Sequence, residues 1–162
     1  MSIKLLFMDV DGTLTDGKLY IGTNGEIMKA FFVKDGHGIK HLRSVYGVRP
    51  IILTGRESKI VQERCKELGI TDFHQSVNDK VAVIKSYEKD YGANAFAYMG
   101  DDTNDEEAIQ YVNSKGGITA CPADATSTVK KIVTYVSAYK GGAGAVRDFT
   151  EYLIANNLVA KQ

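Results

Sequence analysis

Carboxylates gather directly after an apolar stretch near the start of the sequence. The segment FMDVDGTLTDG, residues 7–17, places Asp9 and Asp11 at the end of the apolar run 3–10. Like charges this close repel one another, and each is unfavourable at a strand end unless a cation neutralises it. The segment is therefore either a solvated turn or a site that holds a cation and a phosphate.

Two further segments place polar residues directly after an apolar run, and we call these three segments the polar tips. Thr54, Gly55 and Arg56 follow the apolar run of VRPIILTGR, and Asp101 and Asp102 follow that of AFAYMGDDTND. Carboxylate oxygens with few nitrogen or sulfur donors nearby favour Mg²⁺. An aspartate can attack phosphorus to give an aspartyl-phosphate, and a second carboxylate can protonate the leaving alcohol and then activate water.

Phosphoryl transfer to a carboxylate also needs groups that neutralise the phosphoryl oxygens. Lys80, at the start of a predicted helix, supplies a point charge. Thr54 and the turn amides around Gly12 and Gly55 supply hydrogen-bond donors. These components favour a metal-assisted phosphoryl transfer.

Alternating strands and helices must position these tips. Short apolar runs predict strands at 3–10, 48–53, 72–77, 95–99, 116–122 and 131–137, and helical spacing predicts helices at 37–46, 58–68, 80–91, 106–113 and 146–156. Asp35 is expected to be the N-cap of the first helix. This alternation predicts a doubly wound, Rossmann-like α/β fold with a mostly parallel sheet. Ligands of such folds bind outside the carboxyl ends of the strands, where the polar tips would converge.

A β-hairpin is expected between the first strand and the first helix. Asn24-Gly25 lies between two short runs rich in Tyr, Ile and Phe, which favours a type I′ turn with positive φ at both central residues. The resulting flap, about residues 17–34, is too short to be a separate cap domain. We therefore expect residues 1–162 to form a single domain.

Composition narrows the possible partners and location. The chain has 162 residues, of which 44% are hydrophobic and 25% charged, and its 20 Lys+Arg balance its 20 Asp+Glu. This balance predicts no nucleic-acid or membrane partner. Cys65 and Cys121 are expected to be core residues rather than a disulfide or zinc ligands. No run approaches the roughly 18 apolar residues of a membrane span, and no signal-peptide pattern occurs at the N-terminus, so we expect a cytoplasmic protein.

The order of the motifs resembles that of the haloacid dehalogenase superfamily. The matching residues are the DVDGT of residues 9–13, Thr54 after IIL, Lys80, and GDD at 100–102 followed by Asp105. The resemblance implies that Asp9 is the nucleophile and Asp11 the general acid/base. It implies that Thr54 and Lys80 bind phosphate, with the amide of Gly55 beside them.

The same resemblance implies how Mg²⁺ would be held. Its ligands would be Asp9, the backbone carbonyl of Asp11, and Asp101. Asp102 and Asp105 would have supporting roles, although each could instead simply cap the helix that follows.

Beyond the motifs, the chain is similar to the capless 3-deoxy-D-manno-octulosonate 8-phosphate phosphatases over almost its whole length. The matching stretches are DGTLTDGKLYIGTNGEIMKAFFVKDGHGIK, LTGRESKIVQERCKELGI and GGAGAVRDF. This similarity implies hydrolysis of a small sugar-acid phosphate in lipopolysaccharide sugar biosynthesis. It also implies a homotetramer whose hairpins meet at the centre and close the site. The implied substrate contacts are Phe32, Val33, Lys34, Asp35, Gly36, Lys40, Arg56 and Arg64.

Several alternatives remain open from the sequence. The nonulosonate 9-phosphate phosphatases are similar in motifs and assembly, but there a Glu can follow the Thr-Gly, whereas this chain has Arg56 and then Glu57. Phe32 stands where relatives often carry a polar residue, so a contact there would come from the backbone. Arg147 would reach a neighbouring subunit's site or form a local salt bridge. A catalytically inactive assembly partner of a sugar-nucleotide transferase is the non-enzyme alternative.

Overall fold

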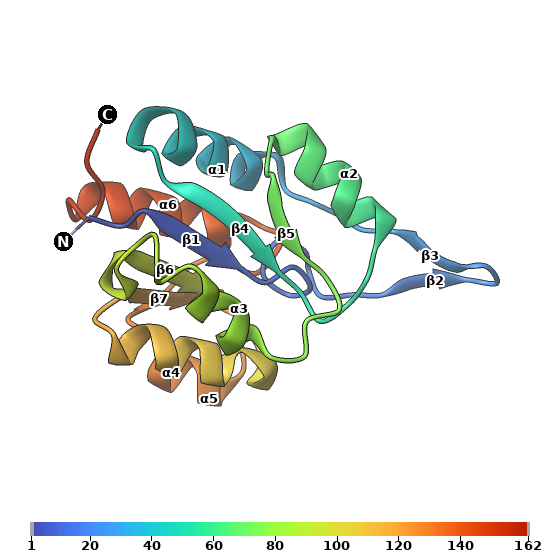
Figure 1. Cartoon of the computed structure of the whole chain (residues 1–162). Coiled ribbons are helices and arrows are strands. Elements are labelled where there is room, and N and C mark those ends of the chain that lie inside the picture. Colours follow the sequence, from blue (N-terminus) through green and yellow to red (C-terminus); the bar gives the residue numbers. More distant parts are fainter. Residues whose placement is uncertain (1, 162) are drawn as a thin grey trace.

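A six-stranded parallel sheet forms the centre of the computed structural model, which describes residues 2–161 (Figure 1). Its strands are β1 (Leu5–Met8), β4 (Arg49–Leu53), β5 (Asp72–His74), β6 (Phe96–Met99), β7 (Ile118–Cys121) and β8 (Tyr135–Val136). They lie in the order β5-β4-β1-β6-β7-β8, and every neighbouring pair is parallel. The chain runs outward from β1 to β5 and then crosses back to β6, so the strand order reverses at β1.

Helices cover both faces of this sheet (Figure 1). One face carries α1 (Val33–Tyr46), α2 (Lys59–Leu68) and α6 (Ala145–Ala155). The other carries α3 (Lys80–Ser86), α4 (Glu106–Ser114) and α5 (Ser127–Ile132). Single 3₁₀ turns at Ala93–Ala95 and Thr103–Asp105 flank β6. The expected doubly wound α/β fold is confirmed.

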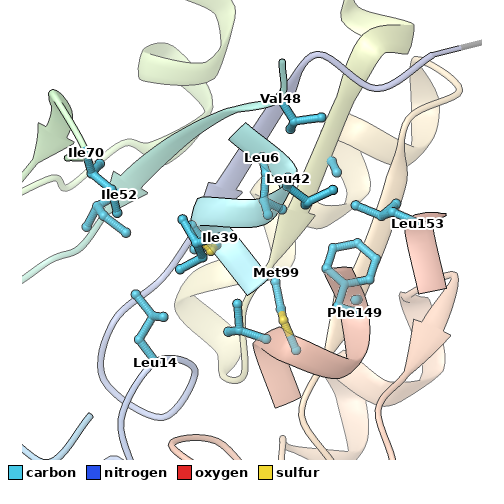
Figure 2. Close-up of a cluster of buried hydrophobic side chains, with 14 of the residues drawn as sticks. Leu6, Leu14, Ile39, Leu42, Val48, Ile52, Ile70, Met99, Phe149 and Leu153 are labelled. Carbon is cyan, nitrogen blue, oxygen red and sulfur yellow. The ribbon is translucent and has the colours of Figure 1, made fainter. Parts of the chain in front are cut away.

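The side chains of β1 alternate between two hydrophobic clusters, one on each face. Leu6 and Met8 pack with residues of α1, α2 and α6, while Leu5 and Phe7 pack with residues of α3, α4 and α5. Figure 2 shows the first cluster, in which Leu6 and Met99 from the sheet lie among helix side chains such as Leu42 and Phe149. Because both faces are covered, a central parallel strand is apolar at every position. This burial fixes where β1 ends and therefore where Asp9 begins the polar tip.

The hairpin forms a sheet of its own and projects beyond the main sheet (Figure 1). It consists of β2 (Tyr20–Gly22) and β3 (Gly25–Met28), with Gly22 opposite Gly25. Thr23 and Asn24 form the loop, and the positive φ falls on Gly25 (+100°) rather than on Asn24. The predicted type I′ turn is therefore wrong, although the hairpin itself is present. The large apolar side chains exposed on and beside it are Leu19, Ile21, Ile27 and Met28.

Asp35 has a different role from the one predicted. Helix α1 begins at Val33, with Phe32 as its N-cap, so Asp35 lies in the first turn instead of capping it. Its Oδ1 accepts a hydrogen bond from the backbone N–H of Arg147 (2.8 Å) at the start of α6, whose N-cap Gly144 offers no side chain. Asp35 therefore caps a helix that lies more than a hundred residues away in the sequence.

Other differences concern element boundaries near the end of the chain. Helix α3 ends at Ser86, earlier than the predicted residue 91. Helix α5 was not predicted from the sequence, and the strand predicted at 131–137 is reduced to β8 at Tyr135–Val136. The two cysteines are buried and unpaired, as expected of core residues. Among residues 2–161, no helix combines the length and apolar character needed to cross a membrane.

Candidate active site

The three polar tips line one cavity at the carboxyl ends of β1, β4 and β6. The cavity has a volume of about 390 Å³. Its lining residues are Asp9, Asp11, Gly17, Thr54, Gly55, Arg56, Asp101, Asp102, Thr103 and Asn104. β4 and β6 flank β1 on either side, so segments far apart in the sequence meet where the strand order reverses. The structure thus brings the three predicted polar tips together, while Lys80 is not among the residues that line this cavity.

Lys80 joins two buried carboxylates beneath this cavity. Its Nζ donates to Oδ1 of Asp9 (3.0 Å) and to Oδ1 of Asp105 (2.6 Å). Asp9 is 4% exposed and Lys80 5% exposed. Burial lowers the pKa of Lys80, but the two carboxylates outweigh this effect and raise it, so Lys80 remains a cation. A buried positive charge therefore lies next to Asp9.

Asp105 is fully engaged with protein donors. Its Oδ1 also accepts from the Tyr98 hydroxyl (2.5 Å), and its Oδ2 accepts from the backbone N–H groups of Asp101 (3.0 Å) and Asp102 (3.4 Å). Tyr98, in the buried strand β6, was not singled out from the sequence, because a tyrosine in an apolar strand gives no sign of its hydroxyl partner. Asp105 therefore fixes the loop that carries Asp101, which fits a supporting role.

The open oxygen ligands at the cavity floor come from Asp9 and Asp101. Carboxylate oxygens of Asp9, Asp101 and Asp105 lie within 4.8 Å of one another, but those of Asp105 already have hydrogen-bond donors. A side chain at Gly12 would overlap the Asp101 carboxylate, so the glycine leaves room for it. This all-oxygen donor set fits Mg²⁺.

The electrostatics of the cluster also fit a cation. Burial raises the pKa of Asp101 to about 7, and the neighbouring Asp105 adds to the shift. Burial and Asp105 likewise raise the pKa of Asp9, while Lys80 opposes them. Both groups thus resist ionisation in the bare protein, and a bound divalent cation would favour their charged forms.

The side chain of Asp11 is not part of this cluster. It turns toward the hairpin, where Lys29 Nζ contacts its Oδ1 and Arg56 Nε lies 3.8 Å from its Oδ2. Lys29 also bonds Glu26 (2.9 Å), whose other carboxylate oxygen accepts from the Ser58 hydroxyl. Lys29 was not predicted to be a functional residue, because a lysine in a short run of alternating polarity is typical of a surface position. An Asp11 side chain outside the cluster fits the prediction that only its backbone carbonyl would face the metal.

A glycine-rich segment near the C-terminus packs against the loop after β1, which carries Asp11. The N–H of Gly142 donates to the carbonyl of Thr13 (3.2 Å). The Cα of Gly141 lies so close to the carbonyl of Gly12 that a methyl group there would overlap it. The backbone that carries Asp11 is thus held by residues 141–142.

The predicted substrate contacts are divided between separate places. Arg56 lines the catalytic cavity. Phe32 and Lys34 line a second cavity of about 350 Å³, whose other lining residues are His37, Tyr139, Ala143, Gly144, Arg147, Asp148 and Glu151. A third depression of about 90 Å³ contains Val33, Gly36, Lys40 and Arg64. Within one chain, these two cavities do not share lining residues with the catalytic one.

The side chains of the predicted contact Asp35 and of Arg147 have local partners. Asp35 is 1% exposed and faces the start of α6, so a substrate contact at this position would come from the backbone. Arg147 Nε pairs with Oε1 of Glu151 (2.6 Å), which is the local salt bridge weighed as an alternative. Asp102, at the rim, accepts from the backbone N–H of Thr103 (2.7 Å).

Curated proteins of high similarity share one name. The chain is 39% identical over 155 residues to 3-deoxy-D-manno-octulosonate 8-phosphate phosphatase KdsC of Escherichia coli K12, covering 94% of this chain and 80% of the relative. It is 36% identical over 155 residues, with the same coverage, to the protein of that name from Yersinia pestis. No family model matches the chain.

Solved structures agree with the sequence relatives. The cobalt-bound deoxy-D-mannose-octulosonate 8-phosphate phosphatase of Haemophilus influenzae is 37% identical with a TM-score of 0.87, covering 96% of this chain and 90% of the other. The 3-deoxy-D-manno-octulosonate 8-phosphate phosphatase of Moraxella catarrhalis, solved with magnesium, phosphate and KDO, is 35% identical with a TM-score of 0.87, covering 96% and 89%.

Fold and site together define a haloacid dehalogenase-type α/β protein, with an aspartate pair at the end of the central strand and no separate cap domain among the described residues. The sequence identity and coverage of the relatives show which family within this class the chain belongs to. The chain belongs to the 3-deoxy-D-manno-octulosonate 8-phosphate phosphatase family.

Proposed function

We propose that the protein is a Mg²⁺-dependent phosphatase that hydrolyses 3-deoxy-D-manno-octulosonate 8-phosphate to the free sugar acid and phosphate, in lipopolysaccharide sugar biosynthesis. Membership of the family supports this substrate. The observation that carries the chemistry is the buried Asp9 at the cavity floor, with Lys80 at 3.0 Å and Asp101 beside it. This arrangement supplies a nucleophile, a fixed positive charge and an oxygen ligand at one point.

In the first step, a carboxylate oxygen of Asp9 attacks the phosphorus and forms an aspartyl-phosphate. The bond between phosphorus and the C8 oxygen breaks, and protonated Asp11 gives its proton to that oxygen. In the second step, Asp11 takes a proton from water while the water oxygen bonds to phosphorus. The bond to Asp9 then breaks, which releases phosphate and restores both carboxyl groups.

The surrounding groups hold the phosphoryl oxygens. Lys80 offers a fixed ammonium next to Asp9, and Thr54 and Gly55 line the catalytic cavity. Asp9, Asp101 and the Asp11 carbonyl would hold Mg²⁺, which when bound supplies positive charge against the phosphoryl oxygens. Arg56, on the rim, is placed to bind the sugar-acid carboxylate.

Replacing Asp9 tests this function. Asp9→Asn keeps the size of the side chain and removes the nucleophile, so we expect Mg²⁺-dependent phosphate release to fall at least 10³-fold, on the order of the loss expected for a missing nucleophile. The matched control is Asp90→Asn, an exposed aspartate away from the cavity, with activity within about twofold of wild type. A wild-type protein without phosphate release would refute the enzyme and favour an inactive assembly partner. Release that survives Asp9→Asn would refute the nucleophile.

A nonulosonate 9-phosphate is the second candidate substrate. Both compounds are phosphorylated 2-keto-3-deoxy sugar acids, and Arg56 on the rim could bind the carboxylate of either. The residue after Thr54-Gly55 is Arg56 rather than Glu, which favours the octulosonate. A side-by-side comparison of kcat/KM on the two phosphates decides between them, and equal, slow turnover of both would refute the specific assignment.

We further propose that the chain is one domain, residues 1–162, that acts in the cytoplasm as a homotetramer through the flap of residues 17–34. Exposed apolar side chains on and beside the hairpin support association through this element. The position of Phe32, Lys34, Lys40 and Arg64 outside the catalytic cavity supports it as well. In an assembly these residues could complete the site of a neighbouring copy.

A further inference from the structure

Lys29 is a buried cation that the proposed mechanism leaves without a role. It comes from the residue after β3, yet its side chain is only 2% exposed. Lysine is rarely buried to this extent unless its charge is paired. Its ammonium contacts two carboxylates, those of Asp11 and Glu26.

The contacts of Lys29 and its partners connect three segments: the loop after β1, the hairpin and the start of α2. Glu26 is the second residue of β3, and its other oxygen accepts from the hydroxyl of Ser58. Ser58 in turn caps α2, because its Oγ accepts from the N–H of Val61 (3.3 Å). The ammonium is therefore held from the side of α2 as well as from the hairpin, and its position does not depend on a single flexible side chain.

Asp11 has few other ways to fix its carboxylate. Among the ion pairs of residues 2–161, the other charged neighbour of Asp11 is Arg56, whose Nε lies 3.8 Å away and whose side chain is 48% exposed. The hydroxyl groups in the loop after β1 bond to residues other than Asp11. Thr13 Oγ1 donates to Asp101, and Thr15 Oγ1 accepts from the backbone N–H groups of Gly12 and Gly17. Lys29 is thus the buried contact that decides where the Asp11 carboxylate points.

From this geometry, we infer that Lys29 is a positioning residue that holds the Asp11 carboxylate at the edge of the cavity, away from the cluster of Asp9 and Asp101. The inference rests on the proposed function, in which Asp11 moves protons to the leaving oxygen and from water. Glu26 and Ser58 extend the same support. The hairpin therefore contributes to proton transfer through its own side chains.

Rates measured on two substrates distinguish a positioning role of Lys29 from a general loss of structure. A sugar-acid phosphate has an alcohol leaving group that needs a proton, whereas p-nitrophenyl phosphate releases a phenolate that leaves without one. Lys29→Met should lower kcat on the sugar-acid phosphate on the order of 10²-fold, within the range of general acid–base catalysis. The first turnover of p-nitrophenyl phosphate should change less than about threefold and appear as a burst, because the second step still needs Asp11.

Matched variants sharpen the result. Lys29→Arg keeps the charge and should recover activity to within about tenfold of wild type. Lys89→Met, an exposed lysine outside the flap and away from the catalytic cavity, should remain within about twofold. If Lys29→Met fails to fold, Glu26→Gln removes the ionic support of Lys29 and should give the same pattern at smaller size. Equal losses on both substrates, or wild-type rates, would overturn the inference.

A crystal structure of Lys29→Met provides a test that needs no turnover. We expect the Asp11 carboxylate to leave its place beside the hairpin while Asp9, Lys80 and Asp105 keep their contacts. An unmoved Asp11 would overturn the inference even if the enzyme were active. A wild type inactive on both phosphates would instead refute the proposed function, so the two failures are distinguishable.

Discussion

Asp9 and Asp11 are two residues apart and meet entirely different partners. Asp9 is buried against Lys80, while Asp11 faces the hairpin and lies between Lys29 and Arg56. Their roles follow from these surroundings, because the same carboxyl group acts as a nucleophile, a proton carrier or a structural acceptor according to what lies next to it. Asp35 is the third case, a buried acceptor for the start of α6.

Asp35 should make stability depend on pH. Burial raises its pKa to about 6, against the opposing effect of the backbone N–H of Arg147, whereas its ordinary value is 3.8. The folded state therefore binds more protons than the unfolded state between these values, and the free energy of unfolding falls as pH rises from about 4 to about 6. The contribution is on the order of 3 kcal/mol, present below pH 4 and lost above pH 6.

Asp35→Asn removes this titration and tests it by urea unfolding at several pH values. Relative to wild type, the variant should gain stability as pH rises through the window. Asp72→Asn is a control of opposite sign, since burial opposes but Arg49 lowers the pKa of Asp72, and wild type should gain on that variant as pH rises. Parallel pH profiles for wild type and Asp35→Asn would contradict the prediction.

At the scale of elements, the ends of three strands were predictable and the segments that support them were not. The tips after β1, β4 and β6 follow from apolar runs that end in polar residues, a purely local signal. The cap that Asp35 provides, the contact of Lys29 with Asp11 and the packing of residues 141–142 are contacts between distant segments. No local pattern encodes them. Asn24-Gly25 predicted the hairpin, but its loop lies one residue earlier, at Thr23 and Asn24, with Gly25 paired to Gly22.

The glycine-rich segment before α6 should control the geometry of the catalytic loop. Gly141→Ala would push a methyl group into the carbonyl of Gly12, next to Asp11. We expect a loss of about 1–3 kcal/mol in the free energy of unfolding, as for other overpacked sites, and a clear fall in kcat. The control is Gly92→Ala, where the methyl group would meet only the tip of the Asn94 side chain. Urea unfolding and initial rates measure both effects, and equal behaviour of the two variants would contradict the prediction.

At the scale of the whole molecule, one chain holds the reactive groups but leaves its cavity open. Arg56 stands on the rim with its side chain 48% exposed, and the flap projects away from the main sheet (Figure 1). A capless site needs another way to exclude water, and association of copies through the hairpins would provide it. The sequence could suggest this only by resemblance, because exposure of apolar residues depends on the fold.

Association through the hairpin predicts a specific response to mutation. The double variant Ile21→Ser, Ile27→Ser removes two exposed apolar side chains and should convert a tetramer into smaller species with reduced phosphatase activity. Phe73→Ser, an exposed apolar residue on the edge strand β5, should leave the assembly intact. Light scattering after size-exclusion chromatography measures the mass. A fully active wild-type monomer would refute the proposed assembly.

The central position of β1 has a consequence for how the protein is made. In the order of synthesis, β1 precedes both of its neighbours, and the later one, β6, ends only at Met99. The nascent chain must therefore carry a strand whose side chains are all apolar until its second neighbour has been synthesised. The same pairing brings Asp101 beside Asp9, so the mutual repulsion of the two acids arises only when β6 docks on β1. Neutral variants of either aspartate should therefore change the docking of β6 on β1 rather than the steps that precede it.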